Sequence, residues 1–68
     1  MTPEQVAARR ELGKCAYEHA MSTTKCNKDS WRRRLHDTRL RAKEVGVLVS
    51  EVRRIIVTAR EAARIDGK

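Results

Sequence analysis

The sequence has 68 residues, of which sixteen are Lys or Arg and nine are Asp or Glu, so its formal net charge is +7. This length fits one small domain (1–68), and a content of one Trp, one Tyr and no Phe argues against a large self-sufficient core. No apolar stretch approaches the ~20 residues of a membrane span. The N-terminus begins with a polar helix start rather than a signal peptide, so we expect a cytoplasmic protein without membrane contact.

The first predicted helix covers residues 3–20. Thr2 can cap it, Pro3 suits its first position, and Gln5 stands where a capping box needs it. Its apolar stripe is thin and contains Ala8, Leu12, Cys15 and His19. Such a stripe buries little area, so this helix needs a second element to pack against. Residues 22–29 have the composition of a loop, which ends at a cap on Asp29 or Ser30.

The second predicted helix covers residues 30–65, because apolar side chains recur there at steps of four and three without a slip. The fold class is therefore all-α, with the short helix folded on the long one as a helical hairpin. In this hairpin the short helix would cover the long helix only as far as Gly46, which leaves the second half of the long helix uncovered. We therefore expect a homo-oligomer or a protein partner on this half. The predicted protein interface consists of Val45, Leu48, Val49, Val52, Ile55, Ile56 and Ala59.

The alternative fold is a three-helix bundle with a turn near Gly46. The spacing of Ala42, Gly46, Val47, Val52 and Ile55 resembles a helix-turn-helix, in which Arg53 and Arg54 would lie on the recognition helix. Against this alternative, Leu48 and Val49 would occupy a turn that is normally polar. A glycine inside a helix costs only about 1 kcal/mol, so the uninterrupted helix is favoured.

Arginine side chains are concentrated in the long helix. Between residues 30 and 44 there are six basic residues and two acidic ones. In the heptad register, Arg32, Arg39, Arg53 and Arg60 form one column, which sets Arg against Arg in a simple two-stranded coiled coil and so disfavours that assembly. The predicted nucleic-acid-binding residues are Arg32, Arg33, Arg34, Arg39, Arg41 and Lys43. Trp31 beside them is either a core residue or a surface on which a base can stack.

The two cysteines and two histidines leave several interpretations open. Cys15, His19, Cys26 and His36 could approach one another in a hairpin and bind structural zinc, although their spacing matches no standard ligand pattern. A Cys15–Cys26 disulfide and simple free thiols are the alternatives, and free thiols are the favoured one. No catalytic motif is present, so we predict no enzyme activity and no cofactor.

These patterns predict a small basic helical protein that binds nucleic acid, mainly the backbone of a duplex and DNA in preference to RNA, in a regulatory or packaging role. The alternative function is a protein–protein adaptor or inhibitor. In that case the apolar and Arg-flanked helix would dock on an acidic partner.

Overall fold

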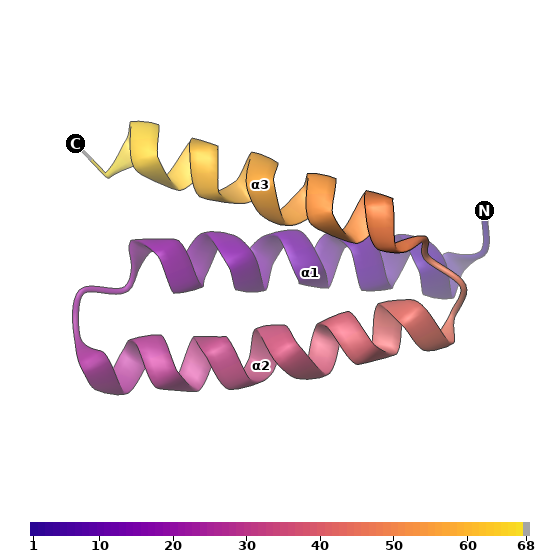
Figure 1. Cartoon of the computed structure of the whole chain (residues 1–68), viewed down its shortest axis with the longest axis horizontal. Coiled ribbons are helices and arrows are strands. Elements are labelled where there is room, and N and C mark those ends of the chain that lie inside the picture. The colour runs from indigo at the N-terminus through magenta and orange to yellow at the C-terminus, as the bar shows by residue number, and fades with distance from the viewer. Residues whose placement is uncertain (68) are drawn as a thin grey trace.

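The computed structural model describes residues 1–67 and consists of three helices. Helix α1 spans Pro3–Met21, α2 spans Lys25–Glu44 and α3 spans Val49–Asp66 (Figure 1). No strand occurs among these residues, so the predicted all-α class is confirmed. No helix in this part of the chain is long and apolar enough to cross a membrane.

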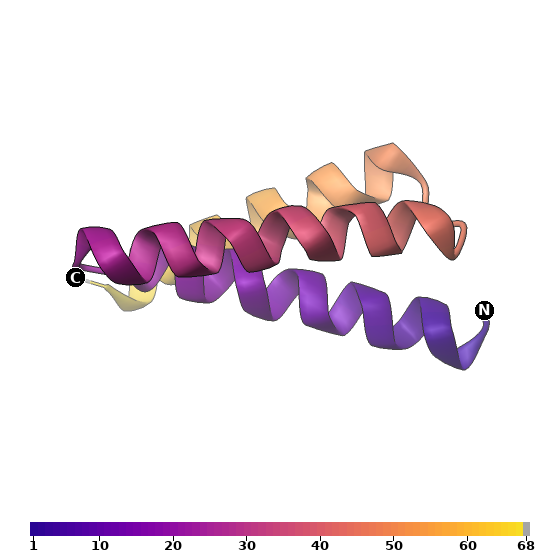
Figure 2. The same cartoon turned by 90° about the horizontal axis from the view of Figure 1, so that it is seen from below.

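Helix α1 is the central element. It packs on both α2 and α3, whereas α2 and α3 have few direct contacts with each other. In Figure 1, α1 lies between the other two helices, which draw apart from the turn that joins them. Figure 2 shows α2 and α3 running along α1 rather than across it. The molecule is therefore an open arrangement of three helices and measures 34 × 22 × 18 Å.

The start of α1 follows the prediction closely. The Thr2 hydroxyl accepts a hydrogen bond from the Gln5 backbone N–H, and the Gln5 side chain accepts one from the Thr2 N–H, both at 3.2 Å. This reciprocal pair satisfies two N–H groups that the helix itself cannot satisfy. At the other end, helix α1 stops at Ser22, whose backbone N–H donates to the His19 carbonyl at 3.3 Å and whose hydroxyl donates to the Glu18 carbonyl at 2.8 Å.

Helix α2 begins five residues earlier than expected, so the predicted loop over 22–29 is wrong. The connection contains only residues 22–24, and Thr24 is the cap: its side chain accepts from the Asn27 backbone N–H at 3.2 Å. The polar composition of this stretch suggested a loop. However, no proline or glycine interrupts residues 25–29, and one capping threonine is enough to start the helix there.

The predicted continuous helix over 30–65 is wrong as well, and the helical hairpin with it. The chain turns at Gly46, whose φ is +93°, as the three-helix alternative requires. The Val47 N–H donates to the Ala42 carbonyl at 2.9 Å and the Gly46 N–H to the Lys43 carbonyl at 3.2 Å. These two bonds form a Schellman motif, which ends a helix with a residue in the left-handed region. Glycine fits that region without steric cost.

The turn is favoured because it lets α3 fold back onto α1. Val52, Ile56 and Ala63 of α3 are buried there. Burial of one Val or Ile side chain contributes about 1.5–3 kcal/mol. The burial of Val52 and Ile56, together with Ala63, therefore contributes more free energy than the exposure of Leu48 and Val49 costs. The remainder of the core comes from α1, α2 and the turn and contains Ala8, Leu12, Cys15, Ala16, Leu35, Ala42 and Val47.

Most residues of the predicted protein interface are packed within the chain itself. Val52 and Ile56 are buried within the same chain, and Val45, Ile55 and Ala59 are partly buried against its core. Leu48 and Val49 stay exposed, at 66% and 58%. The apolar half of the predicted long helix is therefore largely covered by α1, and self-association is not needed to cover it.

Two polar contacts fix α3 on α1. The Arg9 guanidinium forms an ion pair with the Glu51 carboxylate near the start of α3. The Tyr17 hydroxyl donates to the Asp66 carboxylate at 2.8 Å near its end. Helix α3 runs back beside α1, and it slants behind α2 in Figure 2.

Candidate nucleic-acid interface

A groove of about 290 Å³ lies between α2 and α3 next to the turn. Its apolar lining consists of Leu40 of α2, Val47 of the turn, and Val49 and Val52 of α3. Its polar lining comes from α2 and consists of His36, Arg39 and Lys43. We call this feature the α2–α3 groove. It exists because α2 and α3 pack on α1 rather than on each other.

The α2 side of the groove is positively charged. Arg39 and Lys43 line it directly, and both side chains belong to exposed residues. Arg32 lies seven residues before Arg39 and therefore on the same flank of the helix. Arg32 also lies 4.0 Å from Asp29, but both side chains are more than half exposed, so this pair neutralises little.

The α3 side is positively charged too. Arg53 follows Val49 by four residues and Arg60 follows Arg53 by seven, so both lie on the flank that Val49 presents to the groove. Both arginines are exposed. The arginine column predicted along one continuous helix is thus divided at Gly46 between α2 and α3. Arg39 lines the α2–α3 groove, whereas Arg60 lines a separate hollow beside residues 20–23.

The six predicted nucleic-acid-binding residues do not share one face. All six are exposed. Arg32, Arg39 and Lys43 belong to the flank of α2 that borders the groove. Arg33 lines an outer hollow with Asp29, Arg32 and His36, and a second one with Arg34 and Asp37. Arg41 alone lies next to α1.

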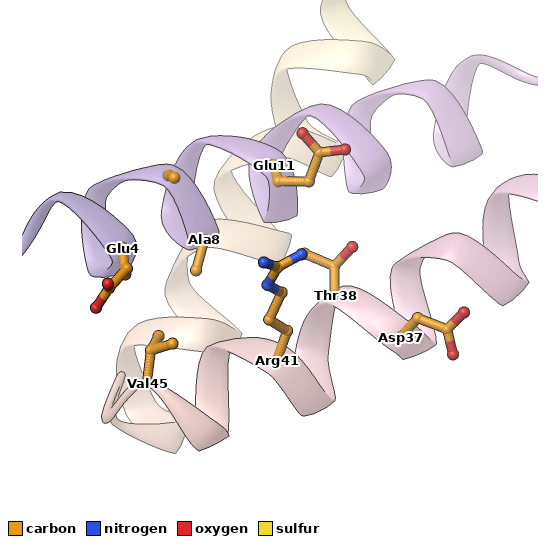
Figure 3. A pocket seen from close by; sticks show the side chains of 8 residues that line it. Glu4, Ala8, Glu11, Asp37, Thr38, Arg41 and Val45 are labelled. Atoms are coloured by element: carbon orange, nitrogen blue, oxygen red, sulfur yellow. The ribbon is translucent and has the colours of Figure 1, made fainter.

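Arg41 lies in acidic surroundings. It lines a hollow of about 380 Å³ between α1 and α2, together with Glu4, Glu11 and Asp37. Figure 3 shows its guanidinium directed toward α1, whereas the carboxylates of Glu4 and Asp37 point away from it. The three acidic residues lower the positive potential around Arg41, while the lining of the α2–α3 groove contains no acidic residue.

Trp31 is partly buried and packs against the core. The Arg34 guanidinium lies over its ring, 5.1 Å from the centroid. One side of the indole is thus engaged by the protein and another by a cation, an arrangement typical of a cation–π contact. The core interpretation of Trp31 is favoured over a free stacking surface.

The zinc interpretation has no geometric support. Among residues 1–67, no three side chains of Cys, His, Asp or Glu come together as metal ligands. Cys15 is buried, and its sulfur lies 3.7 Å from the Thr38 hydroxyl, whereas Cys26 is exposed at the start of α2. Both thiols are free, so the Cys15–Cys26 disulfide is wrong.

The predicted binding set lacked Arg53 and Arg60, although their heptad relation to Arg39 was visible in the sequence. A continuous helix would place Arg53 about 21 Å from Arg39 along its axis. The turn at Gly46 brings their two flanks together instead.

Comparison of the chain with protein-family models, with curated proteins and with solved structures gave no match.

Proposed function

We propose that this protein binds the sugar-phosphate backbone of a nucleic-acid duplex with the basic flanks of the α2–α3 groove. The observation that supports the proposal is that Arg39 and Lys43 line the groove from α2, while Arg53 on α3 lies one helical turn after the groove-lining Val49. Arg32 and Arg60 extend these two basic flanks beyond the groove. Their carboxylate-bearing neighbours lie mainly on the other side of α2. A regulatory or packaging role fits such binding, because backbone contacts carry no sequence information.

The charge density of a duplex favours binding by a row of cations. Double-stranded DNA carries one negative charge per ~1.7 Å of its axis, and each phosphate that a cation neutralises releases condensed counterions. Arginine suits this task because its planar guanidinium forms two parallel hydrogen bonds to a phosphate. One Trp and one Tyr are too few for binding of single strands by stacked aromatic side chains, which favours the duplex.

The test is a titration of a labelled DNA duplex with the full chain at several salt concentrations. The affinity is expected to fall steeply with salt, with a slope that reports the number of phosphates contacted. The double variant Arg39→Gln/Arg53→Gln should reduce that slope by about 2, because two contacts are lost. An RNA duplex in the same titration distinguishes the two nucleic acids.

The matched control is Arg10→Gln/Lys14→Gln. Both residues are exposed on α1, and their helical positions are opposite its buried residues Leu12 and Cys15. This variant removes the same charge from the chain, so it lowers only the general attraction to the duplex. Equal slopes for the two double variants, or no binding of DNA or RNA at low salt, would refute the proposal.

A further inference from the structure

The α2–α3 groove has an apolar component that backbone binding does not use. Val47 and Val52 form its buried lining, and Leu40 and Val49 are exposed beside them, at 51% and 58%. The neighbouring Leu48 is exposed at 66%. Phosphates and sugars offer little apolar surface to cover these side chains. The groove therefore has room for a ligand that is apolar on one side and acidic at its edges.

The open packing of the three helices indicates what shape such a ligand has. Helices α2 and α3 are both held by α1, and near the turn they leave a groove between them that no described part of the chain fills. In helical bundles, a groove of this kind between two helices accepts a further helix. From His36 to Lys43 the groove follows α2 for two turns, so a helix of about three turns would cover it.

A second copy of the chain is a poor occupant. In a two-fold dimer the same surface meets itself, so the cations Arg39, Lys43 and Arg53 of one copy would approach those of the other. Such pairing of like charges is unfavourable. The charge of the groove instead complements carboxylates on either side of an apolar stripe.

We infer that the α2–α3 groove is a docking site for an acidic amphipathic helix of a partner protein, which packs on the exposed Leu40 and Val49 while its carboxylates meet Arg39, Lys43 and Arg53. The docked helix completes a four-helix arrangement around the turn. Because it occupies the same cations, it also excludes a nucleic-acid duplex from this part of the surface.

The test uses synthetic helical peptides of roughly 18 residues, long enough to form a helix on binding. One carries Leu on one face with Glu at both edges, and the second has Gln in place of each Glu. Calorimetric titration of the full chain, without nucleic acid, is expected to give about tenfold tighter binding of the Glu peptide. Absence of binding by the Glu peptide, or equal binding of both peptides, would overturn the inference.

Two valines of α3 provide a matched pair of variants. Val49 and Val57 are almost equally exposed, at 58% and 57%, but only Val49 lines the groove. Val49→Asn is expected to weaken the Glu peptide by about tenfold or more, whereas Val57→Asn, which likewise adds no charge beside Arg53, leaves its affinity unchanged. Circular dichroism of both variants verifies that the helices remain. Equal weakening by the two substitutions would contradict docking in the groove.

Light scattering tests whether a second copy of the chain occupies the α2–α3 groove. The free chain is expected to be monomeric and to stay so in Val49→Asn. A wild-type dimer that Val49→Asn dissociates would replace the partner helix by a second copy and refute the inference. Since the peptide titrations contain no nucleic acid, their failure leaves the duplex-binding proposal intact, and the salt titrations test that proposal separately.

Discussion

Gln5 of α1 and Val45 at the end of α2 are joined by a hydrogen bond of 2.9 Å, which the Gln5 side-chain amide donates to the Val45 carbonyl. The oxygen of the same amide accepts from the Thr2 N–H at 3.2 Å. One side chain thus caps the start of α1 and holds the residue before Gly46. This contact between residues forty positions apart ties the turn, which borders the α2–α3 groove, to the start of α1.

The contact can be removed while the cap is kept. In Gln5→Glu a side-chain oxygen still accepts from Thr2, and Glu is a favoured residue at this place in a capping box. The donor to Val45 is lost, however, and a carboxylate approaches its carbonyl oxygen. We expect a loss of about 1–2 kcal/mol in the free energy of unfolding, measured by urea denaturation.

Thr2→Ala is the control for this prediction. It removes the Thr2 hydroxyl, at a cost of about 1 kcal/mol, but leaves the bond to Val45 in place. If Gln5→Glu unfolds at the wild-type urea concentration, the Gln5–Val45 bond contributes nothing to stability.

Replacement of Gly46 by Ala tests the turn itself. Gly46 has a φ of +93°, which an L-residue with a Cβ adopts at a cost of about 1–2 kcal/mol. The new Cβ would also lie 3.2 Å from the Gln5 Nε2, so the hydrogen bond to Val45 is disturbed. Gly46→Ala should therefore lower the melting temperature, whereas a continuous helix through this position would gain stability from it.

Gly13→Ala provides the opposite case. Gly13 lies inside α1, and a Cβ there would meet Ile55 Cγ2 at 3.6 Å, an ordinary contact distance. Because alanine is the better helix former by about 1 kcal/mol, this variant should raise the melting temperature. A decrease would indicate that α1 and α3 pack more closely than the structure has them.

Two leucines differ in their contribution to the core. Leu12 is fully buried and Leu48 is exposed at 66%. Leu12→Ala is expected to cost about 3 kcal/mol, which approaches the whole stability of a domain of this size. Leu48→Ala should change the free energy of unfolding by less than about 0.5 kcal/mol. Chemical denaturation followed by circular dichroism compares the two.

The contact of Tyr17 with Asp66 makes the stability of the folded protein depend on pH in alkaline solution. Its hydrogen bond to the Asp66 carboxylate, together with desolvation and the negative charge of Asp66, raises the pKa of Tyr17 above its ordinary value of 10.0. The folded state therefore favours the protonated phenol. This contribution is complete below pH ~10 and is lost as the pH rises through the raised pKa.

The ultraviolet absorbance of the tyrosinate measures this pKa directly, because Tyr17 is the one tyrosine of the chain. In Asp66→Asn the titration midpoint should return toward the ordinary value. Glu18→Gln is the control and should lower it less, since Glu18 is the weakest contributor to the shift. An unchanged midpoint in Asp66→Asn would show that the two side chains do not interact in solution.

Local sequence signals predicted the ends of α1 well but the middle of the chain poorly. The Thr2–Gln5 capping box depends on neighbouring residues, which the sequence displays. The fate of Gly46 depends on α1, which lies some thirty residues away in the chain. A heptad pattern records which side chains face inward on each helix, and it remains unbroken when two helices meet the same central helix from different sides.

The positive charge of the proposed binding surface could be predicted from the sequence, but its division between two helices could not. An excess of arginine in residues 30–44 indicated the charge, and the column containing Arg39 and Arg53 indicated the flank. That the column is divided between α2 and α3 follows from the packing of Val52 and Ile56 on α1. Burial decided the arrangement, and helical periodicity alone does not report it.

The central place of α1 has a consequence for local opening of the protein. Helix α3 is held by one neighbour, through a single apolar face, one ion pair and one tyrosine hydrogen bond. It can therefore detach as a unit while α1 and α2 remain paired, which requires less free energy than complete unfolding. Backbone amides of α3 should exchange with deuterium sooner than those around Leu12 and Leu35. A ligand that contacts both α2 and α3 would slow that exchange.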